Sequence, residues 1–231
     1  MLQPRYLLHT GEGDRFGEAV HHIDVYAFDS LGIYRKMFRD KGAHLKNGYQ
    51  MPIDLPEGKW TFLCLGGKVG DYEIGIFKTG IPQQFSPAVS PGITTLSDFR
   101  VKAYFEQKEN LEYSFGELFF GRLDSVEITA DNGGTGVIDL MKNTNKIEVR
   151  VKGIADGSSA RITSDNGRFN SENVTPADAG TIIYVPYYSA SQADDTRVFQ
   201  FDVLRLYTDG HLFLKFCLLY TSPSPRDKRQ S

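Results

Sequence analysis

Short runs in which apolar and polar residues alternate dominate this chain of 231 residues. In the segment 145–153, Ile147, Val149 and Val151 alternate with charged side chains, so one face is apolar and the other is polar. No segment sustains apolar residues at helical spacing for three turns. Gly, Pro, Asn and Asp separate the runs, as is typical of turns between strands. The pattern therefore predicts an all-β fold.

The alternation predicts strands throughout the chain. Residues 16–19 are expected to form at most one helical turn, because the alternation of Ile23, Val25 and Ala27 just after them favours a strand. The expected strands are 5–10, 21–29, 32–38, 49–55, 59–67, 98–106, 117–121, 124–130, 136–141, 145–153, 159–164, 181–188, 196–207 and 211–216.

These strands are more than one ordinary β-sandwich of about seven to nine strands uses. We therefore expect two tandem β-sandwich domains, residues 1–122 and 123–216, the second of them incomplete. The main breaks in composition are the loop 80–92 and the Gly-rich segment 130–136.

The last two strands are predicted to form a hairpin over residues 199–216. Asp209-Gly210 joins them, and this dipeptide is favoured where a tight turn needs a positive φ. The Ser/Pro/Arg string that follows has no strand to pair with. Its start, CLLYTSPSPRD, is also the translation of a transposase adapter used in preparing sequencing libraries. We expect residues 217–231 to be a disordered, artefactual tail.

Composition and charge narrow the class of protein. Hydrophobic residues make up 40% and charged residues 24%, which is typical of a globular chain. The net charge is −3, and Lys and Arg are dispersed, so no nucleic-acid partner is expected. No apolar stretch approaches the roughly 20 residues of a membrane helix. The first 16 residues lack a signal peptide, so either the protein is cytosolic or its true beginning is missing.

Histidines are the first candidates for a metal site. His21 and His22 are adjacent on a strand, so they point to opposite faces and cannot bind one ion together. His22 and Asp24 share a face and could contribute two ligands. No third ligand can be identified, because the remaining histidines, His9, His44 and His211, lie in other runs.

No other motif indicates catalysis or a cofactor. Nucleophile-elbow, zinc-protease, P-loop and Cys-x-x-Cys patterns are absent from the sequence. The segment 164–173, SDNGRFNSEN, lacks the spacing of a calcium loop and is interpreted as a turn. We therefore predict no enzymatic activity, no catalytic residue, no metal and no cofactor, and we assign no binding residue.

Cysteines and tyrosines leave alternatives open. Cys64 lies in an apolar run and is interpreted as a buried structural residue; Cys217 belongs to the suspected tail. Tyr184, Tyr187 and Tyr188 could form a platform on which a sugar stacks, although packing within the protein also explains them.

Six segments in order resemble one known family: VHHIDVYAFDSLGIYRKM, YQMPIDLPEGKWTFLCLGG, GITTLSDFRVKAY, ELFFGRLDSVEITADNGGTGVIDLMKNTNKIEVRVKG, SDNGRFNSEN and IIYVPYY. Together they resemble the FimB/Mfa2 group, the fimbrial anchor and accessory subunits of Bacteroidales. The resemblance extends over about residues 5–216. It implies two tandem transthyretin-like (Ig-like) sandwiches and a lipoprotein held at the outer membrane. The lipid-bearing cysteine is expected to precede Met1.

From this resemblance we expect a structural and adhesion subunit at the cell surface that anchors or initiates a fimbrium. Its partners would be fimbrial shaft or accessory subunits. Assembly would occur by β-strand addition, in which a strand of one subunit completes a sheet of another. The alternative is an outer-surface carbohydrate-binding β-sandwich module.

Overall fold

A computed structural model describes residues 1–7, 13–78, 84–103, 110–111, 115–131, 133–192, 194–207 and 210–217. Within these residues almost all regular structure is β-strand, which confirms the all-β prediction. The exceptions are the one-turn helix α1 (Phe16–Ala19), as expected, and the 3₁₀ turn η1 (Val69–Asp71). No helix in this described part is long and apolar enough to cross a membrane.

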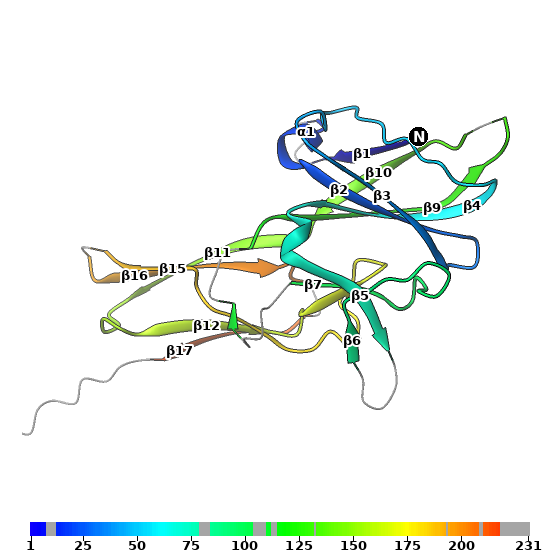
Figure 1. Cartoon of the computed structure of the whole chain (residues 1–231). Helices are drawn as coiled ribbons and strands as arrows, with labels where there is room; N and C mark the ends of the chain where they lie inside the picture. The colour runs from blue at the N-terminus through cyan, green and yellow to red at the C-terminus, as the bar shows by residue number, and fades with distance from the viewer. Residues whose placement is uncertain are drawn as a thin grey trace, which may run out of the picture.

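The largest sheet has six strands in the order β1-β10-β9-β4-β2-β3. Only β1 runs parallel to its neighbour β10; the other pairs are antiparallel. Figure 1 shows this sheet at the N-terminal end of the molecule. The strands are β1 (Leu2–Tyr6), β10 (Gly136–Lys142), β9 (Leu118–Ile128), β4 (Gly58–Gly67), β2 (His22–Phe28) and β3 (Tyr34–Lys41).

Both faces of this sheet are buried. On one face, Tyr26 and Phe28 of β2 pack against Phe99, with ring centroids 5.3 and 6.0 Å apart. Phe99 belongs to a facing sheet of order β13-β7-β5-β6. On the other face, Ile23, Val25 and Ala27 form a core with α1 and the segment 45–55. The facing strands are β13 (Arg168–Asn170), β7 (Phe99–Ala103), β5 (Tyr72–Lys78) and β6 (Gln84–Ser86).

Two further sheets form the other half of the molecule. Figure 1 shows β11 and β16 lying over β12 and β17. Phe199 of β16 and Phe216 of β17 meet between the layers, with ring centroids 6.2 Å apart. One sheet contains β11 (Thr144–Lys152), β16 (Thr196–Leu204) and β15 (Tyr188–Ser191); the other has β17 (Leu212–Cys217), β12 (Ser159–Ser164), β14 (Ile182–Tyr184) and β8 (Asn110–Leu111).

The sheets exchange strands along the chain. The expected boundary at 122/123 falls inside β9, and β10 still belongs to the six-stranded sheet. Strand β13, from the second half of the sequence, pairs with β7 from the first. One cluster of buried residues extends from Tyr26 in β2 to Phe201 in β16. The division into two sandwiches stays a prediction, and the strand pairing favours a junction at Asn143 instead.

The predicted C-terminal hairpin is wrong. Strand β16 pairs with β11 and β15, whereas β17 pairs with β12 in the opposite sheet. The chain therefore passes from one layer to the other between the end of β16 and the start of β17. Gly210 has no positive φ in the structure, and Asp209 lies outside the described residues.

Several strand predictions also need correction. Residues 49–55 form only an isolated bridge, Leu2 to Met51, because Pro52 and Pro56 lack the N–H that a ladder needs. The run 181–188 is two strands in different sheets, separated at Pro186. The predicted strands 117–121 and 124–130 are one strand, β9. Alternation missed β5, β6, β8 and β13.

Gly75 allows β5 to approach the segment after β6. A Cβ at this position would collide with the carbonyl oxygen of Ser86 and lie 2.9 Å from Cα of Pro87. Gly75→Ala is therefore expected to lower the free energy of unfolding by about 1–3 kcal/mol in urea denaturation. A Cβ on Gly70 would meet nothing within 4 Å, so Gly70→Ala is the matched control and should be nearly neutral. Equal stability of the two variants would contradict the packing.

Candidate functional site

The most exposed apolar segment of the structure is the edge strand β17. All six of its residues are exposed, and Phe213 retains 57% of its accessible surface. Strand β12 pairs with one side of β17; no strand in the described part of the chain pairs with the other. Lys215 is its only charged residue. The strand therefore presents unpaired backbone groups between apolar side chains, the arrangement that recruits another strand.

The edges of the six-stranded sheet are protected. On β1, Leu2 exchanges backbone hydrogen bonds with Met51, Pro4 has no N–H, and the N–H of Tyr6 donates to Asp14 at 2.9 Å. On β3, the N–H of Tyr34 donates to the carbonyl of Thr94 at 2.8 Å. Charged side chains oppose pairing between the edges of two sheets. Strand β3 carries five of them: Arg35, Lys36, Arg39, Asp40 and Lys41.

The remaining edges are short or charged. Strands β6 and β13 have three residues, β8 has two and β15 has four. Strand β11 is long, but Lys146, Glu148, Arg150 and Lys152 are exposed along it. Among the described edges, β17 is therefore the one that combines length with apolar exposure.

His22 and Asp24 lie on one face of β2, as predicted, but they form no metal site. Arg39, opposite Asp24 on β3, donates from Nε to Oδ1 at 2.6 Å and from Nη2 to Oδ2 at 2.7 Å. His22 Nε2 lies 3.0 Å from Oδ1. The hydrogen bond to Asp24 raises the pKa of Arg39. Both carboxylate oxygens of Asp24 thus contact protein groups, and no group of three metal-binding side chains occurs among the described residues.

The other histidines pair singly with carboxylates. His44 Nε2 lies 2.9 Å from Asp40 Oδ1, and His211 Nδ1 lies 2.9 Å from Asp165 Oδ2. His9 lies outside the described residues. Hydrogen bonds from Tyr49 and His44 lower the pKa of Asp40, and one from His211 lowers the pKa of Asp165. One pair lies at the end of β3 and the other at the ends of β12 and β17, in different sheets.

The segment 164–173 links β12 to β13 and braces the interior. Asn166 donates from Nδ2 to the carbonyls of Leu204 and Arg205, each at 3.1 Å. Its Oδ1 accepts a hydrogen bond of 2.9 Å from the hydroxyl of Tyr184. The amide of Asn166 is therefore used to join β14 to the end of β16, which agrees with a structural turn.

The three tyrosines do not form a platform. Tyr184 is fully buried in β14, whereas Tyr188 is exposed at the start of β15 in another sheet. Tyr187 is half-buried, and Nζ of Lys146 lies 5.9 Å from its ring centroid. Cys64 is buried in β4, as predicted, and burial raises the pKa of its thiol. Cys217 is exposed but pairs with Ser159 as the last residue of β17, so the prediction that the disordered tail begins at Cys217 is wrong for this residue; residues 218–231 lie outside the described residues.

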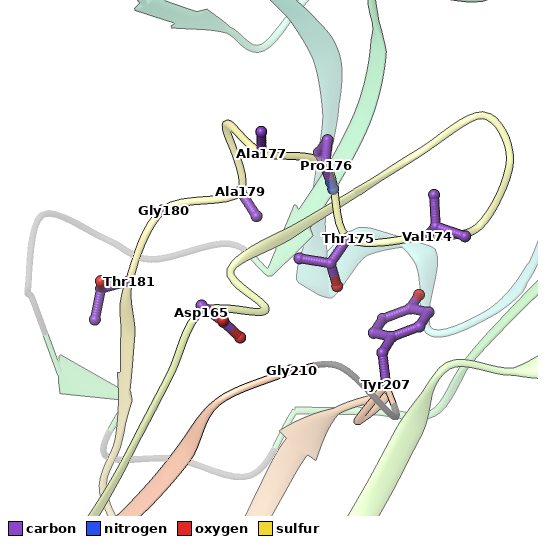
Figure 2. A pocket seen from close by; sticks show the side chains of 10 residues that line it. All are labelled: Asp165, Val174, Thr175, Pro176, Ala177, Ala179, Gly180, Thr181, Tyr207 and Gly210. Atoms are coloured by element: carbon purple, nitrogen blue, oxygen red, sulfur yellow. The ribbon is translucent and has the colours of Figure 1, made fainter.

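A hollow of about 530 Å³ lies between the loop 174–181 and the segment after β16. Figure 2 shows Asp165, Thr175 and Tyr207 around it. Both carboxylate oxygens of Asp165 bond to His211, through its N–H and its ring. Burial raises the pKa of Tyr207. These side chains provide no nucleophile with an adjacent base.

Comparisons with known proteins agree with this architecture. The family model described as fimbrillin-A associated anchor proteins Mfa1 and Mfa2 matches residues 1–222. The chain belongs to the Mfa2 family. This is a family of structural fimbrial anchor proteins at the cell surface and not of enzymes, and the predicted family and absence of catalysis are confirmed. A search of curated protein sequences gave no match.

Solved structures share the fold of this Mfa2-family chain. The fimbrial anchor protein Mfa2 from Porphyromonas gingivalis is 20% identical, with a TM-score of 0.71 over 93% of this chain and 76% of that one. A candidate adhesin from Bacteroides ovatus is 21% identical, with a TM-score of 0.75 over 94% and 71%. A candidate polysaccharide-binding protein from Bacteroides thetaiotaomicron is also 21% identical, with a TM-score of 0.74 over 92% and 74%.

The ion pair of Asp24 with Arg39 should contribute more to the free energy of unfolding than an exposed ion pair does. The side chain of Asp24 is 1% exposed and that of Arg39 is 53% exposed. Arg39→Ala would leave a buried carboxylate with only His22 beside it, and should lower the free energy of unfolding by about 3 kcal/mol in urea denaturation. Arg150, in the exposed pair with Glu148, is the control, and Arg150→Ala should change stability little. Similar losses in both variants would show that the burial of Asp24 has no energetic weight.

Proposed function

We propose that this Mfa2-family chain joins a fimbrial shaft or accessory subunit by β-strand addition at the free edge of β17. The observation that carries the proposal is the run of six exposed, mostly apolar residues with one unpaired side. Backbone hydrogen bonds to the incoming strand would supply continuity between subunits. Alternate side chains of that strand would supply specificity.

The packing around β17 supports insertion beside it. Leu212, Leu214 and Phe216 alternate along the strand, and Phe216 contacts Phe199 in the opposite layer. Even so, Leu214 and Phe216 remain more than a third exposed. A neighbouring strand with apolar residues at every second position would cover these side chains and remove apolar surface from water.

Anchoring at the outer membrane is part of the proposal. Membership in the Mfa2 family supports attachment through a lipid on a cysteine outside residues 1–231. A carbohydrate-binding role has weaker support. The Bacteroides thetaiotaomicron neighbour described in those terms is 21% identical, and Tyr184, Tyr187 and Tyr188 do not share a face in this chain.

A charge on β17 tests strand addition. Phe213→Lys places a charge on the exposed edge strand, where it should abolish co-purification with the fimbrial shaft subunit of the same strain. Because Phe213 is 57% exposed, the variant should retain the melting curve of the parent chain.

Leu31→Lys is the matched control, since Leu31 is 77% exposed and lies in the turn between β2 and β3. This variant should bind like the parent chain. The proposal is wrong if Phe213→Lys still co-purifies with the shaft subunit, or if the parent chain is a monodisperse monomer that binds no shaft subunit. A longer form of the protein that pairs its own strand with β17 would also contradict it.

A further inference from the structure

A second groove lies where the six-stranded sheet meets β11 and the end of β16. It has a volume of about 710 Å³, within the range of ligand-binding clefts. Its walls come from the ends of β1 and β10, the start of β11 and the segment after β16. The groove is separate from β17, which pairs with β12 in a different sheet.

Three large apolar side chains from separate segments line this groove and remain exposed. Leu7, Met141 and Leu206 retain 43%, 41% and 39% of their accessible surface. Apolar side chains gathered in one concavity indicate a binding surface more strongly than the same residues scattered singly. Methionine adapts its shape to different partners, so Met141 suits a contact of this kind.

Arg205 gives the groove an uncompensated positive charge. The other two charged lining residues are paired, Asp139 with Arg5 and Lys142 with Glu117. No carboxylate in the described part of the chain forms an ion pair with Arg205; its Nη1 contacts the sulfur of Met141, and its guanidinium lies over Tyr207, 5.1 Å from the ring centroid. A guanidinium supported by an aromatic ring can still donate hydrogen bonds to a carboxylate from outside.

The walls of the groove are held together by a buried amide. Asn143 has no exposed surface and lies between β10 and β11. Its N–H donates to Leu118 at 2.7 Å, and its carbonyl accepts from the N–H of Arg205 at 2.8 Å. Its side chain and that of Asn173 donate to each other, at 2.5 and 3.1 Å. The groove is therefore preorganised, which reduces the entropy lost on binding.

We propose that this groove binds an extended segment of a neighbouring fimbrial subunit, with apolar residues on Leu7, Met141 and Leu206 and a carboxylate on Arg205. The choice of a protein segment rests on the proposed function, since a fimbrial anchor contacts other subunits. The carboxylate follows from the single unpaired charge. This contact would fix the orientation of the neighbour, whereas strand addition at β17 would hold it.

The test uses a fluorescently labelled heptapeptide with blocked ends, in which one aspartate is flanked by leucine and valine. A matched peptide has asparagine in place of the aspartate. Fluorescence anisotropy with the full chain should show saturable binding of the aspartate peptide, about tenfold weaker for the asparagine peptide, as expected for loss of one charged hydrogen-bonded contact. Binding of the aspartate peptide should weaken as salt increases.

Arg205→Gln should remove the preference for aspartate, so that both peptides bind this variant equally. The four combinations form a double-mutant cycle that isolates the contact between the carboxylate and Arg205. Arg150→Gln, an exposed arginine outside the groove, should retain the preference. Melting curves of both variants should match that of the parent chain.

The inference is overturned if no saturable binding occurs, if the two peptides bind the parent chain equally, or if Arg205→Gln keeps the preference. Phe213→Lys separates this inference from strand addition. That variant should bind the aspartate peptide normally while it loses the shaft subunit. Failure at β17 with intact peptide binding would therefore refute the proposed assembly and not the groove.

Discussion

Every backbone N–H and C=O of a strand must find a partner, and this requirement organises the molecule. Inside each sheet, neighbouring strands meet it. At the edges, this chain uses Pro4, the backbone of Met51 and the carboxylate of Asp14 on β1, and charged side chains on β3. Strand β17 has no proline, no bridging segment among the described residues and only one charged residue, Lys215. The free edge of β17 therefore differs from the edges of the six-stranded sheet in two ways: its apolar side chains are exposed, and it lacks their protection.

The two halves of the molecule depend on a small set of buried polar contacts. Asn143 joins β10 and β11 to Leu118, Arg205 and Asn173. Asn166 joins the end of β16 to Tyr184. A buried polar group without a hydrogen-bond partner destabilises the fold. Removing one of these side chains would therefore cost the desolvation free energy of the partners that it leaves unpaired. One apolar cluster also extends through both halves. Its packing depends on the same arrangement of the sheets that these hydrogen bonds hold in place.

The sequence predicted the fold class well because alternation reports directly on which residues are buried. It predicted pairing poorly, since pairing depends on contacts distant in the chain. Asp209-Gly210 suggested a hairpin, yet β16 and β17 lie in opposite layers. Phe199 of β16 and Phe216 of β17 pack against each other between these layers. Gly75 interrupts the apolar pattern of β5, and the reason, a close approach of Ser86, is visible only in three dimensions.

The candidate site was also beyond reach of the sequence. The alternation Leu212, Leu214 and Phe216 is the signature of a buried strand, and nothing local says that one side of it lacks a neighbour. The sequence predicted that His22 and Asp24 share a face. It did not predict that Arg39, 15 residues away from Asp24, would donate hydrogen bonds to that carboxylate. A cross-strand partner of this kind follows from register, which the alternation alone does not fix.

The arrangement of the proposed contacts suits a protein that carries load. Met1 and β1 lie in one half of the molecule, and β17 lies in the other (Figure 1). If the proposed membrane anchor is attached on the N-terminal side of β1 and the proposed subunit binds β17, tension would pass through the parallel pair of β1 with β10 and then through Asn143. The five-residue register of β1 with β10 places several hydrogen bonds in parallel against this force. The groove with Arg205 lies at the same junction, so a segment bound there would brace the point where the two halves meet.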